Sequence, residues 1–326
     1  MNHAKRHSVV LIAGVALLAA GMVAASSGSY EGPDSLSDNP GNLPLTQMRG
    51  GVQNVTSLLQ NNWAAHAAAS ENVWFRSPSV FAEYSYTDSR DKRVDPFGNT
   101  GFTSHGRNGT LGLNFLSYCD VAVSLAGTYG ITAADAMAPG HLVNNSDTYG
   151  LSLTMAKNID WFLFGVSGSY NDGYSRTRTP IGNILKADTT STTITPFIGA
   201  MYSKGNLSLS TVPAYMYSWT WADFDSTGAA PHADAHPSQE TFVWMNTASY
   251  KICEKVVVSL QANWNRLTHY KKSAAVNVGD REWLTFGPKL TYRFTPSTSA
   301  YVSCTKDLGS GSFDTVQALV GVNYGF

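Results

Sequence analysis

Charged residues are scarce in this chain of 326 residues. Lys, Arg, Asp and Glu together make up 14% of the sequence, and the formal net charge is -1. Ordinary soluble domains carry roughly 25% charged residues, and nucleic-acid-binding surfaces need a basic excess. The composition therefore disfavours an ordinary soluble domain and gives no reason to expect a nucleic-acid partner.

Long apolar runs are absent after the N-terminus. No later segment is apolar over the ~20 residues that a membrane-spanning helix needs. If the chain enters a membrane, it must do so as a closed β-barrel, because lipid does not tolerate unpaired backbone groups. Aromatic residues are frequent at 12%, and a mean hydropathy of -0.14 suits strands that are apolar on one face. A soluble all-β protein remains the alternative on composition alone.

Cysteine is rare. The chain has three, Cys119, Cys253 and Cys304, which are far apart and lack metal-ligand spacing. One disulfide and three free thiols are both compatible with this arrangement.

Catalytic signatures are absent as well. The sequence has no GxSxG motif and no recognisable nucleophile with its base, so we expect neither an enzyme nor a cofactor. His232, Asp234 and His236 stand at a spacing that could bind a metal. Loop histidines are more often solvated surface residues, and we assign no metal site.

The N-terminus has the three parts of a secretory signal peptide. Lys5 and Arg6 precede an apolar run over 9–23, and Val23-Ala24-Ala25 offers small residues for cleavage. The run is shorter than a spanning helix. We therefore predict that residues 1–25 are a cleaved signal peptide and not a membrane anchor.

Two short segments follow the signal peptide. Residues 26–51 are rich in Gly, Pro, Ser and Asn, which predicts a flexible linker. Residues 52–76 contain neither Gly nor Pro and have no charged side chain before Glu71. We predict a helix over 54–72, with Asn54 as its N-cap.

From residue 77 to residue 326, apolar side chains alternate with small or polar ones, which is the period of a β-strand. The alternation is clearest over 121–131, 149–155, 207–219 and 256–265, and about twelve strands can be counted. The second face carries Ser, Thr, Gly, Asn and Gln, where a soluble sandwich would show charges.

Short connections alternate with long ones along this region. The short ones lie at 117–119, 157–158, 203–205, 253–255 and 295–297, and the long ones at 88–103, 133–145, 173–188, 222–240, 271–281 and 306–314. This regular alternation is typical of outer-membrane barrels. The sequence thus predicts an all-β fold, a transmembrane antiparallel β-barrel of about 12 strands with the N-terminal helix in its lumen.

Charge and proline refine the prediction. A Lys or Arg that faces lipid at the midplane costs about 2–4 kcal/mol, so Lys289 and Arg293 are expected to face the lumen. Glu83 shares a face with Phe81 and Ser85 and is expected there too. Three prolines fall inside strands that have no free edge, so bulges are expected at these positions: Pro196, Pro213 and Pro288.

The C-terminal segment VQALVGVNYGF continues the alternation to the last residue. Its apolar face ends in Tyr324 and Phe326. We predict that this face touches lipid, that the strand pairs with the first strand to close the barrel, and that both rings lie in an aromatic girdle on the periplasmic side.

Residues 52–326 resemble the translocator domain of autotransporters. The resemblance is carried by the uncharged helix before ENVWFR, the run HGRNGTLGLNF, the SYND segment with its Arg-containing continuation (170–178) and the closing YGF. It implies passage or surface display of a passenger through the barrel. Residues 26–51 would be a vestigial passenger, since autotransporter passengers are far longer. A small porin-like channel, or a structural or adhesive outer-membrane protein, is the alternative.

The resemblance also implies residue roles. Gly321, Tyr324 and Phe326 match the terminal assembly signal of such barrels, whereas Leu319 stands where a polar residue is expected. The implied location is the outer membrane of a Gram-negative-type bacterium. The implied partners are outer-membrane lipid, the barrel assembly machinery and periplasmic chaperones, and the barrel itself is expected to be a monomer.

A further implication concerns Gln60, Asn61 and Asn62 in the predicted pore helix. Some autotransporters release their passenger by cyclisation at an Asn-Asn pair, assisted by acidic groups in the lumen, a role that Glu83 could take. The alternative is that the three amides form hydrogen bonds to polar groups of the lumen, since buried amides need partners.

Overall fold

The computed structural model describes residues 78–91, 102–116, 121–136, 142–178, 184–226, 233–235, 238–271, 282–309 and 313–326. These ranges hold strands and turns. None of the described residues belongs to a helix of the length and apolarity that crossing a membrane requires. The predicted signal peptide, linker and pore helix lie outside the described residues.

Thirteen strands follow one another along the described part of the chain. They are β1 (Ser79–Asp91), β2 (Phe102–Leu116), β3 (Val121–Ala136), β4 (Leu142–Ile159), β5 (Phe162–Arg178), β6 (Ile184–Lys204), β7 (Leu207–Ser226), β8 (Ala233–Ala235), β9 (Ser238–Cys253), β10 (Val256–Lys271), β11 (Glu282–Thr295), β12 (Thr298–Leu308) and β13 (Phe313–Gly325).

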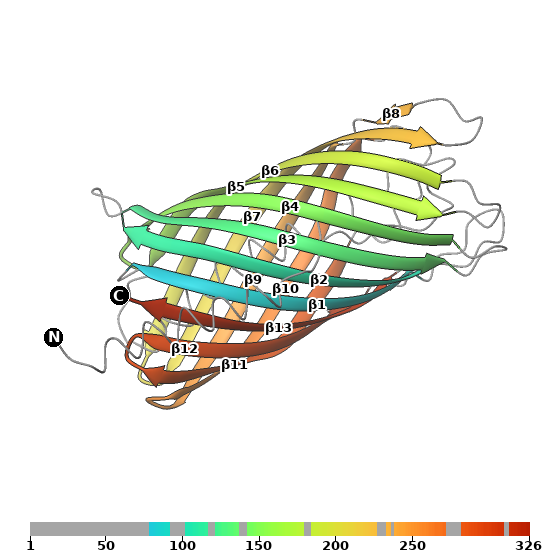
Figure 1. Cartoon of the computed structure of the whole chain (residues 1–326). Coiled ribbons are helices and arrows are strands. Elements are labelled where there is room, and N and C mark those ends of the chain that lie inside the picture. Colours follow the sequence, from blue (N-terminus) through green and yellow to red (C-terminus); the bar gives the residue numbers. More distant parts are fainter. Residues whose placement is uncertain are drawn as a thin grey trace.

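All strands except β8 form one closed antiparallel barrel (Figure 1). Sequence neighbours pair from β1 to β7 and from β9 to β13, while β7 pairs with β9 and β1 pairs with β13. The short β8 adds to the end of β7 beyond the ring. The prediction of an antiparallel barrel of about 12 strands is confirmed.

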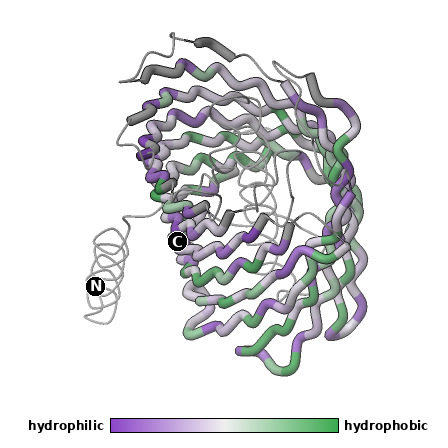
Figure 2. The backbone as a smooth tube through the Cα atoms, turned by 90° about the vertical axis from the view of Figure 1, so that its right-hand side faces the viewer, coloured by the Kyte–Doolittle hydropathy of each residue, from purple (hydrophilic) through white to green (hydrophobic). Residues whose placement is uncertain are grey.

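Hydrophobic and hydrophilic residues follow one another along the strands (Figure 2), and their burial shows that side chains alternate between the two faces of the wall. In β4, Leu151 and Leu153 are exposed on the outside, while Ser152 and Thr154 are buried on the inside. The same alternation holds in β3, β7 and β10, where it was predicted. The outer surface is thus largely apolar.

One end of the barrel, here called the turn end, carries tight hairpin loops. Those within the described residues have two residues each: Asp160-Trp161, Gly205-Asn206, Glu254-Lys255 and Pro296-Ser297. Gly205 (φ 59°) and Asp160 (φ 54°) have the left-handed backbone conformation that tight hairpins favour. The prediction of a turn at 157–158 is wrong by a few residues, because β4 continues to Ile159.

The strands extend further at the opposite end, here called the loop end. The predicted loop 173–188 is mostly strand, because β5 runs to Arg178 and β6 starts at Ile184. The end of β5, from Ser175 to Arg178, has only polar residues. Apolar periodicity cannot detect such a segment, which is why this predicted loop was too long.

The expected bulges at the three prolines do not occur. The β6–β7 ladder is interrupted at Thr195-Pro196, and the β11–β12 ladder at Gly287-Pro288, with the same register on either side. Pro196 still pairs with Val166 on the other side of β6. Proline lacks an N–H and cannot donate a hydrogen bond to the neighbouring strand. Hydrogen bonds are therefore missing on one side of each strand, while the register between the paired strands is unchanged.

The seam between the first and the last strand is fully paired. β1 and β13 are in register from Ser79 opposite Gly325 to Asp91 opposite Phe313. The last residue is also held, since the backbone N–H of Phe326 donates to the carbonyl of Pro78 at 3.1 Å. This pairing explains why the strand pattern continues to the end of the chain.

Candidate functional site

The inner face of the barrel is the candidate site. It is lined mainly by small hydroxyl and amide side chains that are buried and uncharged. They include Ser124, Ser152, Thr154, Ser167, Thr193, Thr195, Ser208, Ser210, Ser249, Ser259, Gln261, Asn263 and Asn265. Several form hydroxyl pairs across neighbouring strands, such as Thr193 with Ser218 at 2.6 Å.

One part of this inner face is apolar. We call it the inner apolar strip, and it consists of buried residues of β5, β6, β7 and β9: Leu163, Phe197, Met201, Val212, Met216, Val243 and Met245. The strip is not evident from the sequence pattern, because Ser and Thr residues dominate the second face of the strands. The alternation in β7 contains the signal, since Val212 and Met216 share the face of Ser210.

The neighbouring wall is polar, so the lumen has two different sides. Asn263 and Asn265 lie on β10, and Thr291 lies on β11. Among the described residues, the side-chain oxygens of all three make no hydrogen bond. Buried polar atoms normally have a partner, so this wall is suited to receive hydrogen bonds from a guest in the lumen.

Three charged or ionisable side chains meet on the inside of the seam. Glu83 (7% exposed), Lys289 (2%) and Tyr301 (4%) are all buried. The Tyr301 hydroxyl donates to Oε1 of Glu83, and Nζ of Lys289 lies 4.1 Å from the centroid of the Tyr301 ring. We call this group the seam cluster. Glu83 and Lys289 have opposite formal charges, so the cluster adds no formal net charge to the lumen.

Gly321 makes the seam cluster possible. It lies between Tyr301 on β12 and Glu83 on β1 in the registers of the two ladders. The Tyr301 ring leans over Gly321 and occupies the place that a Cβ would take. Only a glycine allows this crossing, because any side chain at position 321 collides with the ring.

The same packing recurs at two other places on the inner face. Phe81 lies over Gly112, and Phe197 lies over Gly165, again on directly paired strands. Large inward rings therefore rest on glycines of the adjacent strand.

The other predicted site residues are placed as follows. Arg293 lies two residues beyond Thr291 on the inward side of β11 and is partly buried. Tyr324 and Phe326 lie on the outside near the turn end, with ring centroids 6.3 Å apart. Phe326 is 68% exposed. Gln60, Asn61 and Asn62 lie outside the described residues.

The described residues contain no group of three His, Cys, Asp or Glu side chains that could hold a metal. Asp234 lies on β8, whereas His232 and His236 are outside the described residues. Cys253 and Cys304 are free thiols, so neither is joined to the other, and Cys119 is outside the described part.

We predict that the seam cluster stabilises the closed barrel. Tyr301→Phe removes a donor from the buried Glu83 carboxylate and should lower the free energy of unfolding by about 1–3 kcal/mol. Gly321→Ala should cost about 1–3 kcal/mol, because the new methyl group must displace the Tyr301 ring. The measurement is urea unfolding of the refolded barrel.

Matched controls are available nearby. Tyr292→Phe removes a hydroxyl from the outer surface of β11. Gly127→Ala adds a methyl group that meets only the Gly150 carbonyl, at 4.0 Å. Equal losses in the control and test variants would refute the role of the seam cluster.

Comparison with solved structures finds barrels of similar fold. The translocator domain of the autotransporter NalP from Neisseria meningitidis matches with a TM-score of 0.64 and 13% identity, covering 85% of this chain and 98% of that one. The transport unit of the autotransporter AIDA-I from Escherichia coli matches with a TM-score of 0.63 and 16% identity, over 82% and 99%.

An outer-membrane channel from Pseudomonas putida F1 is less similar, with a TM-score of 0.50 and 10% identity over 77% of this chain and 97% of that one. No protein-family model and no curated protein matches this sequence. At these identities the comparison establishes the fold: the chain has the twelve-stranded barrel architecture of autotransporter translocator domains.

Proposed function

We propose that this chain is an outer-membrane barrel of the translocator type, through which an N-terminal part of the same chain passes toward the cell exterior. The observation that carries the proposal is the closed barrel with an apolar outer face and a buried, largely uncharged inner face. A lipid-facing exterior needs the first property. The predicted signal peptide supports export across the inner membrane.

The inner apolar strip and the polar wall of β10 and β11 are together suited to bind an amphipathic helix, and this chain contains a candidate for that helix. In the predicted helix over 54–72, Val55, Leu59 and Trp63 recur at helical spacing. An apolar stripe of this kind matches the inner apolar strip. The amides of Gln60 and Asn61 fall elsewhere on the helical wheel and match the polar wall, where oxygen atoms lack partners. A helix with side chains is about 10–12 Å wide.

The translocator proposal also has consequences for the oligomeric state, the chemistry and the assembly partners of the chain. The chain would work as a monomer without catalytic chemistry. The barrel assembly machinery and periplasmic chaperones would bring it into the outer membrane, with Gly321, Tyr324 and Phe326 on the strand that they recognise. Release of a passenger by cyclisation at Asn61-Asn62 stays a hypothesis. Glu83 could assist it as an acidic group in the lumen, and this carboxylate already accepts a hydrogen bond from Tyr301.

A small channel is the second candidate function. The fold likeness to an outer-membrane channel favours it, as does the uncharged polar lining. The two functions differ in one property. A translocator with its helix in place conducts few ions, whereas a channel conducts them in the intact protein.

The conductance of single barrels in planar bilayers separates the two. We expect low conductance for the mature chain and a large increase after deletion of residues 26–72, because the guest helix no longer fills the lumen. A synthetic peptide of residues 52–72 should restore the low conductance. High conductance of both proteins would favour the channel, and no conductance of either would contradict both functions.

Surface display tests the passage itself. An epitope inserted in residues 26–51 should be accessible to antibody on intact cells and sensitive to added protease. An epitope placed in the Glu254-Lys255 turn should remain protected from antibody and protease. This turn lies at the turn end, opposite to the loop end at which the N-terminal part would leave the barrel. Protection of the N-terminal epitope would contradict passage.

Ion selectivity of the barrel without residues 26–72 should depend on the seam cluster. Lys289→Gln removes the buried cation and leaves Glu83, so the ratio of cation to anion permeability should rise. Glu83→Gln should shift the ratio in the opposite direction. Reversal potentials in a salt gradient measure both shifts, and unchanged potentials would mean that ions do not pass this cluster.

A further inference from the structure

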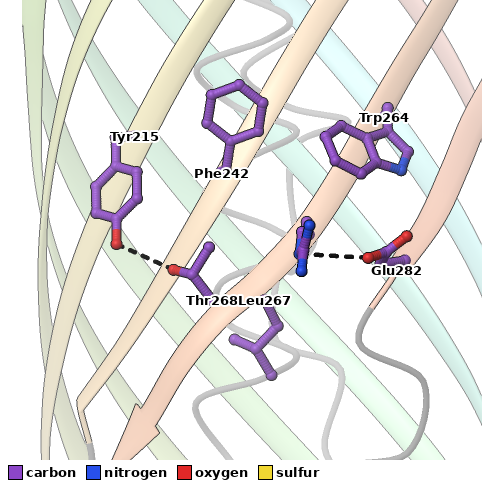
Figure 3. A pocket seen from close by; sticks show the side chains of 7 residues that line it. Tyr215, Phe242, Trp264, Leu267, Thr268 and Glu282 are labelled. Carbon is purple, nitrogen blue, oxygen red and sulfur yellow. Dashed lines mark hydrogen bonds and ion pairs between the residues drawn. The ribbon is translucent and has the colours of Figure 1, made fainter.

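The outer surface of the barrel has a pocket that the translocator function does not use. It lies on β7, β9, β10 and β11 and is lined by Tyr215, Phe242, Trp264, Arg266, Leu267, Thr268 and Glu282 (Figure 3). Its volume is about 470 Å³. We call it the outer pocket.

The outer pocket straddles the boundary between the apolar and the polar part of the outer surface. Along β10 the outward residues change from Leu260 and Trp264 to Arg266, which is exposed. On β9 and β11 the change comes at Glu240 and Glu282, beyond Phe242 and Leu284. In a membrane this level is that of the lipid headgroups on the loop side.

A β-bulge shapes the pocket. The β9–β10 register shifts between Leu267 and His269, so that Thr268 is an extra residue. Its hydroxyl donates to the carbonyl of Glu240 at 3.1 Å and lies 3.0 Å from the hydroxyl of Tyr215. Tyr215 in turn donates to Oε2 of Glu240 at 2.6 Å. This network fixes one side of the pocket.

The other side combines aromatic rings with an ion pair. The rings of Phe242 and Trp264 meet edge to face, with centroids 5.8 Å apart. Nε of Arg266 lies 3.3 Å from Oε1 of Glu282, and both side chains are about half exposed, at 55% and 51%. Exposed in this way, the Arg266 guanidinium can also bind an anion from outside the barrel.

We propose that the outer pocket binds the phosphorylated sugar headgroup of a glycolipid in the outer leaflet. Arg266 suits a phosphate, because guanidinium groups pair well with phosphate oxygens. Glu282 and Glu240 can accept hydrogen bonds from sugar hydroxyls, and the aromatic rings offer flat apolar faces to a sugar ring. Leu260, Leu284 and Trp244 lie on the apolar side of the pocket, where acyl chains would run.

The position of the pocket favours a membrane lipid over a soluble sugar. It opens sideways from the barrel wall, at the headgroup level, and continues into the lipid-facing surface. A free oligosaccharide would leave this apolar continuation unused. The inference rests on the outer-membrane location proposed above.

The test is a titration of the full chain, folded in detergent, with hexa-acylated, bis-phosphorylated lipid A, followed by native mass spectrometry. We expect Trp264→Ala and Arg266→Gln each to weaken binding about tenfold, which corresponds to about 1.4 kcal/mol. Arg266→Gln should also abolish the preference for phosphorylated over dephosphorylated lipid A. Heat-dependent gel mobility verifies that each variant is folded.

Tyr170→Ala and Arg176→Ala provide the matched control. Both residues are exposed on the outside of β5 and do not line the outer pocket. Equal weakening by these variants would overturn the proposal, because it would indicate general adhesion of lipid to the barrel surface. Equal affinity for dephosphorylated lipid A, or for the deacylated sugar phosphate, would overturn it as well.

The failure of this inference and the failure of the proposed function give different results. Flotation of the chain with liposomes measures membrane insertion, and the change in bilayer conductance on deletion of residues 26–72 reports on the lumen. A chain that inserts and discriminates lipid A, but whose conductance does not change on deletion, would refute the translocator proposal and leave the outer pocket assigned. A chain that inserts and translocates but does not discriminate lipid A would refute only the lipid site.

Discussion

Backbone pairing between β1 and β13 is the interaction on which the other features depend. A sheet that is apolar on its outside can lie in lipid only if no strand has an open edge, because unpaired N–H and C=O groups are costly there. The last strand meets the first one along its whole length, and Phe326 is held by Pro78. The C-terminal residues are therefore part of the wall and not a loose end.

Closure creates an interior whose sides are chemically different. Strands from the middle of the chain contribute the inner apolar strip, while β10, β11 and the strands at the seam contribute amides, hydroxyls and the seam cluster. The Tyr301 side chain crosses the last strand over Gly321 and reaches the first. This contact links three strands and places the only described Glu–Tyr–Lys group of the lumen directly at the seam.

The outside is not uniform either. Most of it is apolar, as lipid contact requires, but a bulge in β10 and an aromatic pair beside an ion pair form the outer pocket at the edge of the apolar band. Lumen and outer pocket lie on opposite faces of the same strands. Alternation of side chains lets one strand serve both, since neighbouring residues such as Asn265 and Arg266 point in opposite directions.

The sequence by itself determined the fold class, the number of strands and the facing of most residues. Low charge, period-two alternation and alternating loop lengths are local properties, and the outward direction of Leu151 or Leu153 follows from them. It did not reveal the continuation of β5 to Arg178, because strands that are polar on both faces lack an apolar period. Only the tertiary structure decided which strands lie side by side, and therefore that Tyr301 meets Glu83 across Gly321, and that Tyr215, Phe242 and Arg266 form one pocket. These contacts join residues far apart in the chain, and their partners are set by the register of each ladder, a property of the closed barrel and not of any single strand.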